Sequence, residues 1–301
     1  MNKWFKRTGL GVLGLAIFGG AALVVAAQLG ERKMQRQVDV AAYTLTLPSD
    51  AATLERGRYL YASRGCAECH APSGAGREFI NDGKGMRVKS PNISPGAGSV
   101  VAAYAAADWE RAIRHGVKPN GRPLIIMPSQ DYNRLTDDDT ASLIAYVHQL
   151  PPATGAAAVI ELPTLLKALY GVGVVPDAAA TINHQLAPAK PVAAGVTAVH
   201  GGYVANMCVG CHGAKLSGGK IPGGPPDWPA AANLTPGEGS AMPHYANADQ
   251  FTAMLRTGKR PDGSAVSPVM PFESLAALND IDVQALYLHL KALPPRPAGQ
   301  H

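Results

Sequence analysis

The sequence contains the same unit twice, and this repeat limits the possible folds more than any other feature. A C-x-x-C-H motif at Cys66–His70 recurs at Cys208–His212, 142 residues later. Further landmarks follow each motif in the same order: Pro91–Gly96 and Ala232–Gly237, Arg114–Gly116 and Arg256–Gly258, Met127-Pro128 and Met270-Pro271, and the double prolines Pro151-Pro152 and Pro294-Pro295. Because their offset stays nearly constant, we expect two homologous domains, at residues 50–152 and 195–297.

The N-terminus has the pattern of a membrane or export segment. An uncharged stretch from Thr8 to Gly30 follows three basic residues. About 20 such residues in a helix cross a hydrocarbon core, whereas the apolar part of a secretory signal has only about 7–15. We therefore expect residues 1–36 to be a retained membrane-spanning helix. Cleavage after Val25-Ala26-Ala27 is the alternative.

The charge distribution argues against nucleic-acid binding. The net charge is +5, and residues 1–36 alone hold six basic side chains and one acidic one. The rest of the chain is balanced, with a net charge of +1 in the first expected domain and 0 in the second. Four cysteines are too few for a disulfide scaffold in a chain of 301 residues.

Helices dominate the expected fold, which is all-α with wide loops rich in proline and glycine. Residues 51–64 and 108–115 are candidate helices. Thr136 and Asp139 resemble a capping box that opens a helix ending near Leu150, and Asn279 and Asp282 repeat this pattern in the second copy. The segment 153–194 is an interdomain linker. Its apolar run at Leu162–Val175 predicts a packed interdomain helix, with shallow membrane contact as the alternative.

The two C-x-x-C-H motifs are attachment motifs for c-type haem. Two thiols at this spacing reach the two vinyl groups of one porphyrin, and the following histidine is held beneath the iron. A redox dithiol requires neither the histidine nor a second copy, and a single zinc site would leave the paired histidines and methionines unexplained. We therefore expect two covalently bound haem c groups, attached through Cys66, Cys69, Cys208 and Cys211.

Histidine and methionine are common axial ligands in cytochromes c. His70 and His212 are the expected proximal ligands, while Met127 and Met270 lie at matched positions before a proline and are the expected distal ligands. Three other methionines, Met86, Met242 and Met254, have no equivalent of this quality in the other copy. His115 and His148 are not repeated either, so we expect ordinary surface or loop positions for them.

A proximal histidine needs a hydrogen-bond partner for its second ring nitrogen. Backbone carbonyls in the turns at Pro91-Asn92 and Ala232-Asn233 are the candidate acceptors, although these segments could also be simple turns.

Residues 50–297 resemble the class I cytochrome c family in tandem dihaem form. The segments NISPGAGS, RAIRHGVKPNGRPL and IMPSQDYNRLTDDDTASLIAYVHQLPP are similar to the cytochrome c subunits of bacterial membrane-bound alcohol, aldehyde and gluconate dehydrogenases. Those subunits generally carry three haem domains, whereas this sequence has two motifs, which leaves the partner open. In that family haem is attached outside the cytoplasmic membrane. The resemblance thus implies an N-terminus inside the bacterium and residues 37–301 in the periplasm.

These features predict an electron-transfer protein without a catalytic site of its own. Iron with both axial positions filled has no open position for a substrate. We expect a membrane-tethered dihaem cytochrome, acting as a complex subunit. It would relay single electrons from a dehydrogenase or quinol donor to a downstream cytochrome or oxidase. The alternative is a catalytic dihaem enzyme of the peroxidase or thiosulfate dehydrogenase type, which needs one open or unusually ligated iron.

Overall fold

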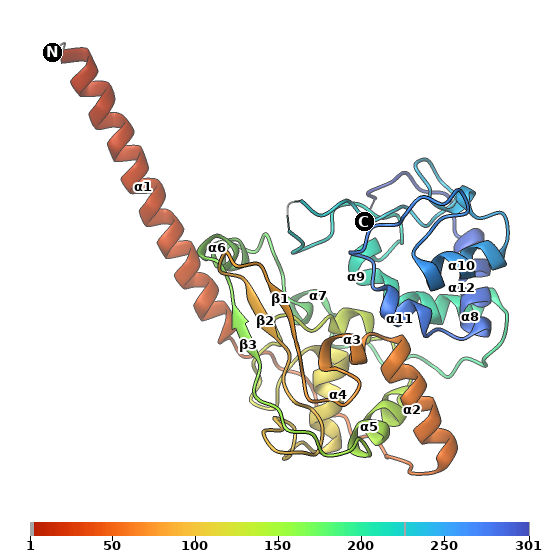
Figure 1. The fold of residues 1–301 in the computed structure, drawn as a ribbon. Coiled ribbons are helices and arrows are strands. Elements are labelled where there is room, and N and C mark those ends of the chain that lie inside the picture. The colour runs from red at the N-terminus through yellow and green to blue at the C-terminus, as the bar shows by residue number, and fades with distance from the viewer. Residues whose placement is uncertain (1–2, 226, 301) are drawn as a thin grey trace.

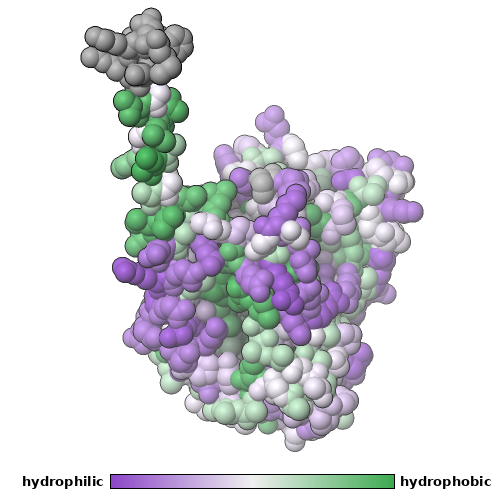
Figure 2. Space-filling model, turned by 60° about the vertical axis from the view of Figure 1, so that its left-hand side comes forward, coloured by the Kyte–Doolittle hydropathy of each residue, from purple (hydrophilic) through white to green (hydrophobic). Residues whose placement is uncertain are grey.

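A computed structural model describes residues 3–225 and 227–300. A single long helix, α1 (Lys3–Met34), projects from a body that contains the two repeats side by side (Figure 1). Within the described residues, α1 is the one helix long and apolar enough to cross a membrane, and its apolar window is not buried by the rest of the chain. Figure 2 shows this apolar column standing clear of the body, with hydrophilic surface around its base.

In the first repeat, defined as residues 50–152, the first and last helices pack against each other. Its helices are α2 (Ala51–Ser63), α3 (Cys66–His70), α4 (Ala106–His115) and α5 (Asp137–His148), with the short 3-10 turn η1 (Ser129–Asp131) before α5. Asp50 caps α2 and Thr136 caps α5, each accepting a hydrogen bond from the backbone three residues on. The predicted helix positions in this repeat are therefore confirmed.

The second repeat, defined as residues 195–297, has its main helices in the same order, with two additional 3-10 turns. Its elements are α8 (Ala198–Val204), η2 (Ala205–Cys208), α9 (Val209–His212), η3 (Met242–His244), α10 (Ala248–Thr257), α11 (Phe272–Ala276) and α12 (Asp280–Ala292). Here α12 packs on α8 as α5 packs on α2. Each repeat has a hydrophobic core of its own, and Leu60 and Ile144 in the first and Leu278 and Val283 in the second are fully buried.

A small sheet modifies the expected all-α fold. Strands β1 (Glu78–Asn81), β2 (Arg87–Lys89) and β3 (Val159–Glu161) pair antiparallel in the order β1-β2-β3, with Val88 opposite Ile160. Strands of three or four residues are too short for an alternating pattern to stand out in the sequence. The third strand also comes from the linker, so that only tertiary contact brings it to the other two.

The main helix of the linker packs on the membrane-helix candidate. This helix, α6 (Thr164–Gly171), packs against α1, and a second short helix, α7 (Ala178–Thr181), contacts η1 of the first repeat. The apolar run thus forms a packed helix in the interdomain segment, as expected, and its partner is the C-terminal part of α1. Two salt bridges support this placement, between Lys167 and Glu31 and between Arg36 and Asp177.

Candidate functional site

The first C-x-x-C-H motif forms a short helix with an abrupt start and end. Gly65 precedes α3 with φ of 83°, and Ala71 follows it with φ of 63°. Positive φ is unfavourable for most residues other than glycine, so the surrounding structure must hold Ala71 in this conformation. The two reversals isolate a single turn on which Cys66, Cys69 and His70 are presented together.

Both proximal histidine candidates use Nδ1 for a backbone hydrogen bond. The His70 Nδ1 atom lies 3.1 Å from the Pro91 carbonyl oxygen, and the His212 Nδ1 atom lies 2.8 Å from that of Ala232. The predicted acceptor turns are therefore confirmed. Burial lowers the pKa of both imidazoles, although these hydrogen bonds oppose the shift. A neutral ring that donates from Nδ1 leaves Nε2 as the nitrogen for a metal.

A cavity of about 410 Å³ in the first repeat brings the predicted ligands together. Its wall includes Cys66, Cys69 and His70 on one segment and Met127 on another, and most of the remaining wall is apolar. Haem c requires two thiols, an imidazole and an apolar pocket, and a thioether in the same pocket supplies the second axial donor. The residues present therefore fit this group.

The state of the four cysteines also fits haem attachment better than dithiol redox chemistry. None of the four is joined in a disulfide. Burial raises the pKa of Cys66 and of Cys208 to about 12. A reactive dithiol lowers the pKa of its attacking thiol to generate thiolate, which is the opposite arrangement.

The two Met-Pro segments adopt the same backbone turn. The Ser129 amide donates to the Met127 carbonyl over 2.9 Å, and the Phe272 amide donates to the Met270 carbonyl over 2.8 Å. The intervening prolines have φ and ψ of −81° and 60° in the first repeat and −78° and 71° in the second, the values of an inverse γ-turn. The matched sequence positions thus correspond to matched backbone geometry.

The competing methionines occupy other environments. Met242 and Met254 are 1% and 3% exposed and belong to the core of the second repeat. Met270 is only partly buried, and it packs at the edge of that core together with Cys208. Met86 lies in the loop between β1 and β2 and is not part of the cavity wall in the first repeat.

The structure contradicts the expected surface position of His115. This side chain is buried, and its Nδ1 atom lies 3.0 Å from Nδ1 of His184 in the linker. The His115 Nε2 atom also lies 3.5 Å from Glu110. His184 in turn bonds to the Ala179 carbonyl, so this pair fastens the linker to α4 and does not belong to the cavity wall. His148 is exposed, as expected.

The turns that hold the histidines contain a network that sequence reasoning missed. The Asn92 side chain donates to the carbonyls of Ala97 and Ala153, and Asn233 donates to those of Glu238 and Arg296. Each asparagine therefore ties its turn to the chain just beyond the last helix of its repeat. The recurrence of asparagine at both positions was the signal that could have revealed this role.

Each C-x-x-C-H segment contacts the other repeat. The Gly210 amide, between Cys208 and Cys211, donates to an Asp131 carboxylate oxygen over 2.6 Å. In the reverse direction, the Ser274 hydroxyl donates to Glu68 over 2.5 Å. Asp131 and Ser274 are at equivalent positions, four residues after Met127 and Met270, so the contact is nearly symmetric. Burial raises the pKa of Asp131 to about 7, although the Gly210 hydrogen bond opposes this.

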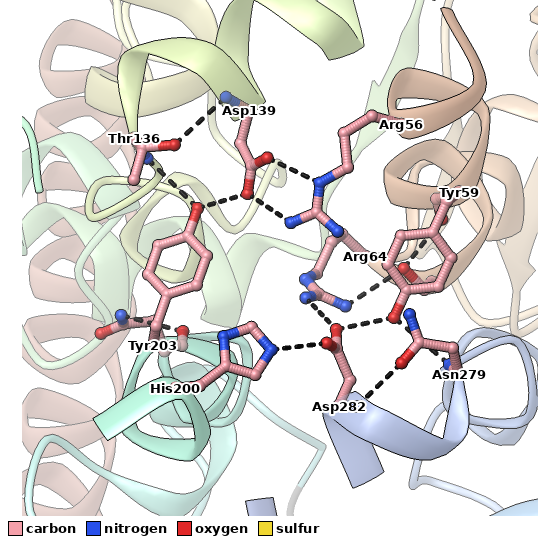
Figure 3. A network of polar contacts seen from close by, with 11 residues as sticks. Arg56, Tyr59, Arg64, Thr136, Asp139, His200, Tyr203, Asn279 and Asp282 are labelled. Atoms are coloured by element: carbon pink, nitrogen blue, oxygen red, sulfur yellow. Dashed lines mark hydrogen bonds and ion pairs between the residues drawn. The ribbon is translucent and has the colours of Figure 1, made fainter. Parts of the chain in front are cut away.

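Asp282 is the centre of a buried polar network between the repeats (Figure 3). Its carboxylate accepts hydrogen bonds from Arg64 over 2.9 Å, Tyr59 over 2.6 Å and His200 over 2.8 Å. The Asp282 and Arg64 side chains are 2% and 3% exposed. Although burial acts in the opposite direction, these partners hold the pKa of Asp282 below its usual value.

Asp139, the equivalent residue of the first repeat, is used in the same way. It forms a bidentate pair with Arg56 and accepts a hydrogen bond of 2.6 Å from Tyr203 of the second repeat. The predicted capping boxes are therefore half right. Thr136 and Asn279 do cap their helices, but the Asp139 and Asp282 side chains reach across the interface and not back to the cap.

Comparisons with known proteins agree with this geometry. Residues 52–147 match the family described as cytochrome C oxidase, cbb3-type, subunit III. The first repeat contains a cytochrome c family domain. Covalently bound haem c is the cofactor of that family, and the Cys66–His70 segment and the cavity beside it lie within the matched residues.

Three curated relatives align with most of the chain. The fructose dehydrogenase cytochrome subunit of Gluconobacter japonicus is 27% identical over 81% of this chain. The gluconate 2-dehydrogenase cytochrome c subunit of Pantoea cypripedii is 27% identical over 83%. The cytochrome c subunit of the quinone alcohol dehydrogenase of Gluconacetobacter polyoxogenes is 26% identical over 85%. The chain spans 53%, 61% and 59% of the lengths of these relatives.

Proposed function

We propose that the chain is a membrane-tethered dihaem c-type cytochrome that relays single electrons. Residues 50–152 and 195–297 would form two cytochrome c domains, with residues 153–194 as the linker. The first domain would hold its haem through Cys66, Cys69, His70 and Met127. The second would use the matched set: Cys208, Cys211, His212 and Met270.

The observation that carries this proposal is the shared cavity of the first repeat. A histidine from α3 and a methionine from the segment before η1 line one apolar space. When both axial positions are filled by such donors, no position remains for a substrate. Bound haem c supplies the one-electron couple of its iron. The chain's contribution is to fix the imidazole, provide the thioether and exclude water with apolar side chains.

The contacts that each C-x-x-C-H segment makes with the other repeat support transfer within the molecule. Gly210 bonds to Asp131 and Glu68 bonds to Ser274, so each attachment segment lies against the other repeat. The C-x-x-C-H motifs of both repeats therefore border the same interface. A relay whose two sites border one fixed interface needs no domain motion between electron entry and exit.

The proposed partners are a dehydrogenase or quinol donor and a downstream cytochrome or oxidase. The names of the relatives support a dehydrogenase complex, and the nearly neutral repeats do not favour long-range steering by net charge. A stable complex, or confinement to one membrane plane, would serve instead. We place α1 in the bacterial cytoplasmic membrane and the repeats in the periplasm.

Replacing the proposed distal ligand tests the assignment. In Met127→Ala, we expect the ferric protein to lose part of its methionine-to-iron absorption. We also expect a lower midpoint potential at one haem, and binding of carbon monoxide to that haem after reduction. The control is Met86→Ala, which changes a methionine of the same repeat outside the cavity. Unchanged spectra in Met127→Ala would exclude Met127 as the ligand. Rapid carbon monoxide binding to the unmodified protein would favour the catalytic dihaem alternative.

A further inference from the structure

Helix α6 packs along the C-terminal part of α1, and the C-terminal end of α6 lies nearer to the apolar stretch of α1. The two helices are so close that a Cβ at Gly30 would overlap the Lys167 backbone, and one at Gly171 would overlap the Ala26 carbonyl. Moving from Lys167 to Gly171 on α6 therefore corresponds to moving from Gly30 to Ala26 on α1. The helices are antiparallel, and Figure 1 shows α6 beside the lower part of α1.

This geometry sets the depth of the α6 end relative to the apolar stretch. Gly30 is the last residue before Glu31, the first charged residue after Thr8. Ala26 lies four residues earlier, which corresponds to about 6 Å along a helix. The end of α6 therefore lies beside the apolar part of α1, at the depth that interfacial helices typically reach, about 5–10 Å.

The turn after α6 exposes apolar side chains at this level. Val172 and Val174 are 60% and 66% exposed. Residues 168–176 include no charged side chain. Neither hydrophobic core of the two repeats includes these aliphatic side chains, and they lie exposed beside an apolar helix.

The backbone amides of the turn are already hydrogen-bonded. The amides of Val172, Gly173, Val174 and Val175 donate to the carbonyls of Ala168, Tyr170, Leu169 and Leu169 in turn. Gly173 makes this possible with φ of 85°. An apolar lipid environment demands internal partners for backbone groups, and the amides of this turn meet that demand.

Charged and polar groups lie next to the turn, on the side away from the apolar stretch of α1. Lys167 pairs with Glu31, Lys33 donates to the Tyr170 carbonyl, and Arg36 forms a bidentate pair with Asp177. Several of these groups are cations. The border therefore fits the anionic headgroups of a bilayer, with the long basic side chains reaching the interface.

We propose that the end of α6 and the turn Val172–Val175 form a second membrane contact, inserted shallowly into the bilayer that holds α1. This inference rests on the proposed insertion of α1. The paired contacts would fix the tilt and rotation of the first repeat over the membrane, because α6 is tied to α1 and the linker is tied to α4 through His184 and His115.

Site-specific photo-crosslinking tests the proposal in the full, haem-loaded chain. A benzophenone amino acid is introduced singly at Val174, Leu15 or Val199, and the protein is placed in nanodiscs of phosphatidylcholine and phosphatidylglycerol. Leu15 lies within α1 and is 74% exposed, so it reports insertion of that helix. Val199 lies on α8 and is 73% exposed, so it is the matched aliphatic control on the far side of the body (Figure 1).

Mass spectrometry of lipid adducts gives the readout. We expect adducts at Leu15 and Val174 and several-fold less at Val199. Adducts at Leu15 with only the Val199 level at Val174 would overturn this inference and leave the proposed tether intact. No adducts at Leu15 would refute both. Equal labelling at Val174 and Val199 would also refute the inference, because the contact would not be specific to the turn.

Discussion

At the scale of single residues, the acidic side chains at the interface between the repeats differ in whether a cation compensates their charge. Asp139 and Asp282 are paired with arginines and bind across the interface between the repeats. Asp131 is also largely buried, but its hydrogen bond comes from the uncharged Gly210 amide. Cys208 and Cys211 lie beside it and bring no compensating cation. Its carboxylate therefore favours the protonated form up to about pH 7.

Asp131→Asn should change how stability depends on pH. The pKa of Asp131 is raised, so between about pH 4 and pH 7 the folded chain retains a proton that the unfolded chain releases, and stability falls as pH rises. The variant should lack this fall and be more stable than the unmodified protein at about pH 8, by at most about 4 kcal/mol. Guanidinium unfolding across this range measures the effect.

The exposed Asp39 supplies the control, because Asp39→Asn changes charge without touching the interface. A parallel pH dependence in Asp131→Asn and the unmodified protein would show that Asp131 ionises normally.

At the scale of elements, each repeat depends on a helix crossing made possible by glycine. A Cβ at Gly57 would overlap the Ser142 carbonyl of α5, and one at Gly201 would overlap the Ala285 carbonyl of α12. Ser142 and Ala285 are equivalent in the two repeats. Glycine thus sets the distance between the first and last helices, which in turn position the segments that carry the cysteines.

Gly57→Ala and Gly201→Ala should each destabilise the repeat that contains the change. The added methyl group meets rigid backbone, so the helices must separate, at a cost of about 1–3 kcal/mol despite the better helix propensity of alanine. Thermal unfolding followed by circular dichroism measures this. Gly195→Ala is the control, because no close backbone surrounds that residue. Stabilisation of either crossing variant would contradict the proposed close contact.

At the scale of the whole molecule, the two repeats are held together by polar groups as well as by packing. Arg64 and Tyr59 of the first repeat and His200 of the second converge on Asp282. Buried charges are costly when a partner is removed, because the remaining charge cannot return to water. The network therefore specifies one relative placement of the repeats, and with it the contacts of each C-x-x-C-H segment with the other repeat.

Asp282→Asn should weaken the molecule by about 3–5 kcal/mol, because it leaves Arg64 buried without its counter-charge. Denaturant unfolding measures this loss, and separate transitions for the two repeats would show that the interface had failed first. Asp138→Asn removes an exposed acid from the first turn of α5 and should cost under about 1 kcal/mol. Equal effects of the two substitutions would show that the Asp282 network does not hold the repeats together.

The sequence by itself determined the repeat, the positions of the main helices and the apolar N-terminal stretch. It also indicated the thiol, imidazole and thioether groups that surround the cavity of the first repeat. These features depend on local spacing: two cysteines and a histidine within five residues, or a cap three residues before its acceptor. Such local relations do not depend on how the rest of the chain folds.

Only the tertiary structure decided the partners of Asp131, Asp139 and Asp282, the burial of His115, the sheet and the packing of α6 on α1. The capping-box pattern at Asp139 and Asp282 shows why. Their spacing is compatible with a local hydrogen bond, but arginines brought by another part of the chain offer a stronger partner. Long-range contacts that depend on desolvated charge become defined only when both repeats are folded against each other.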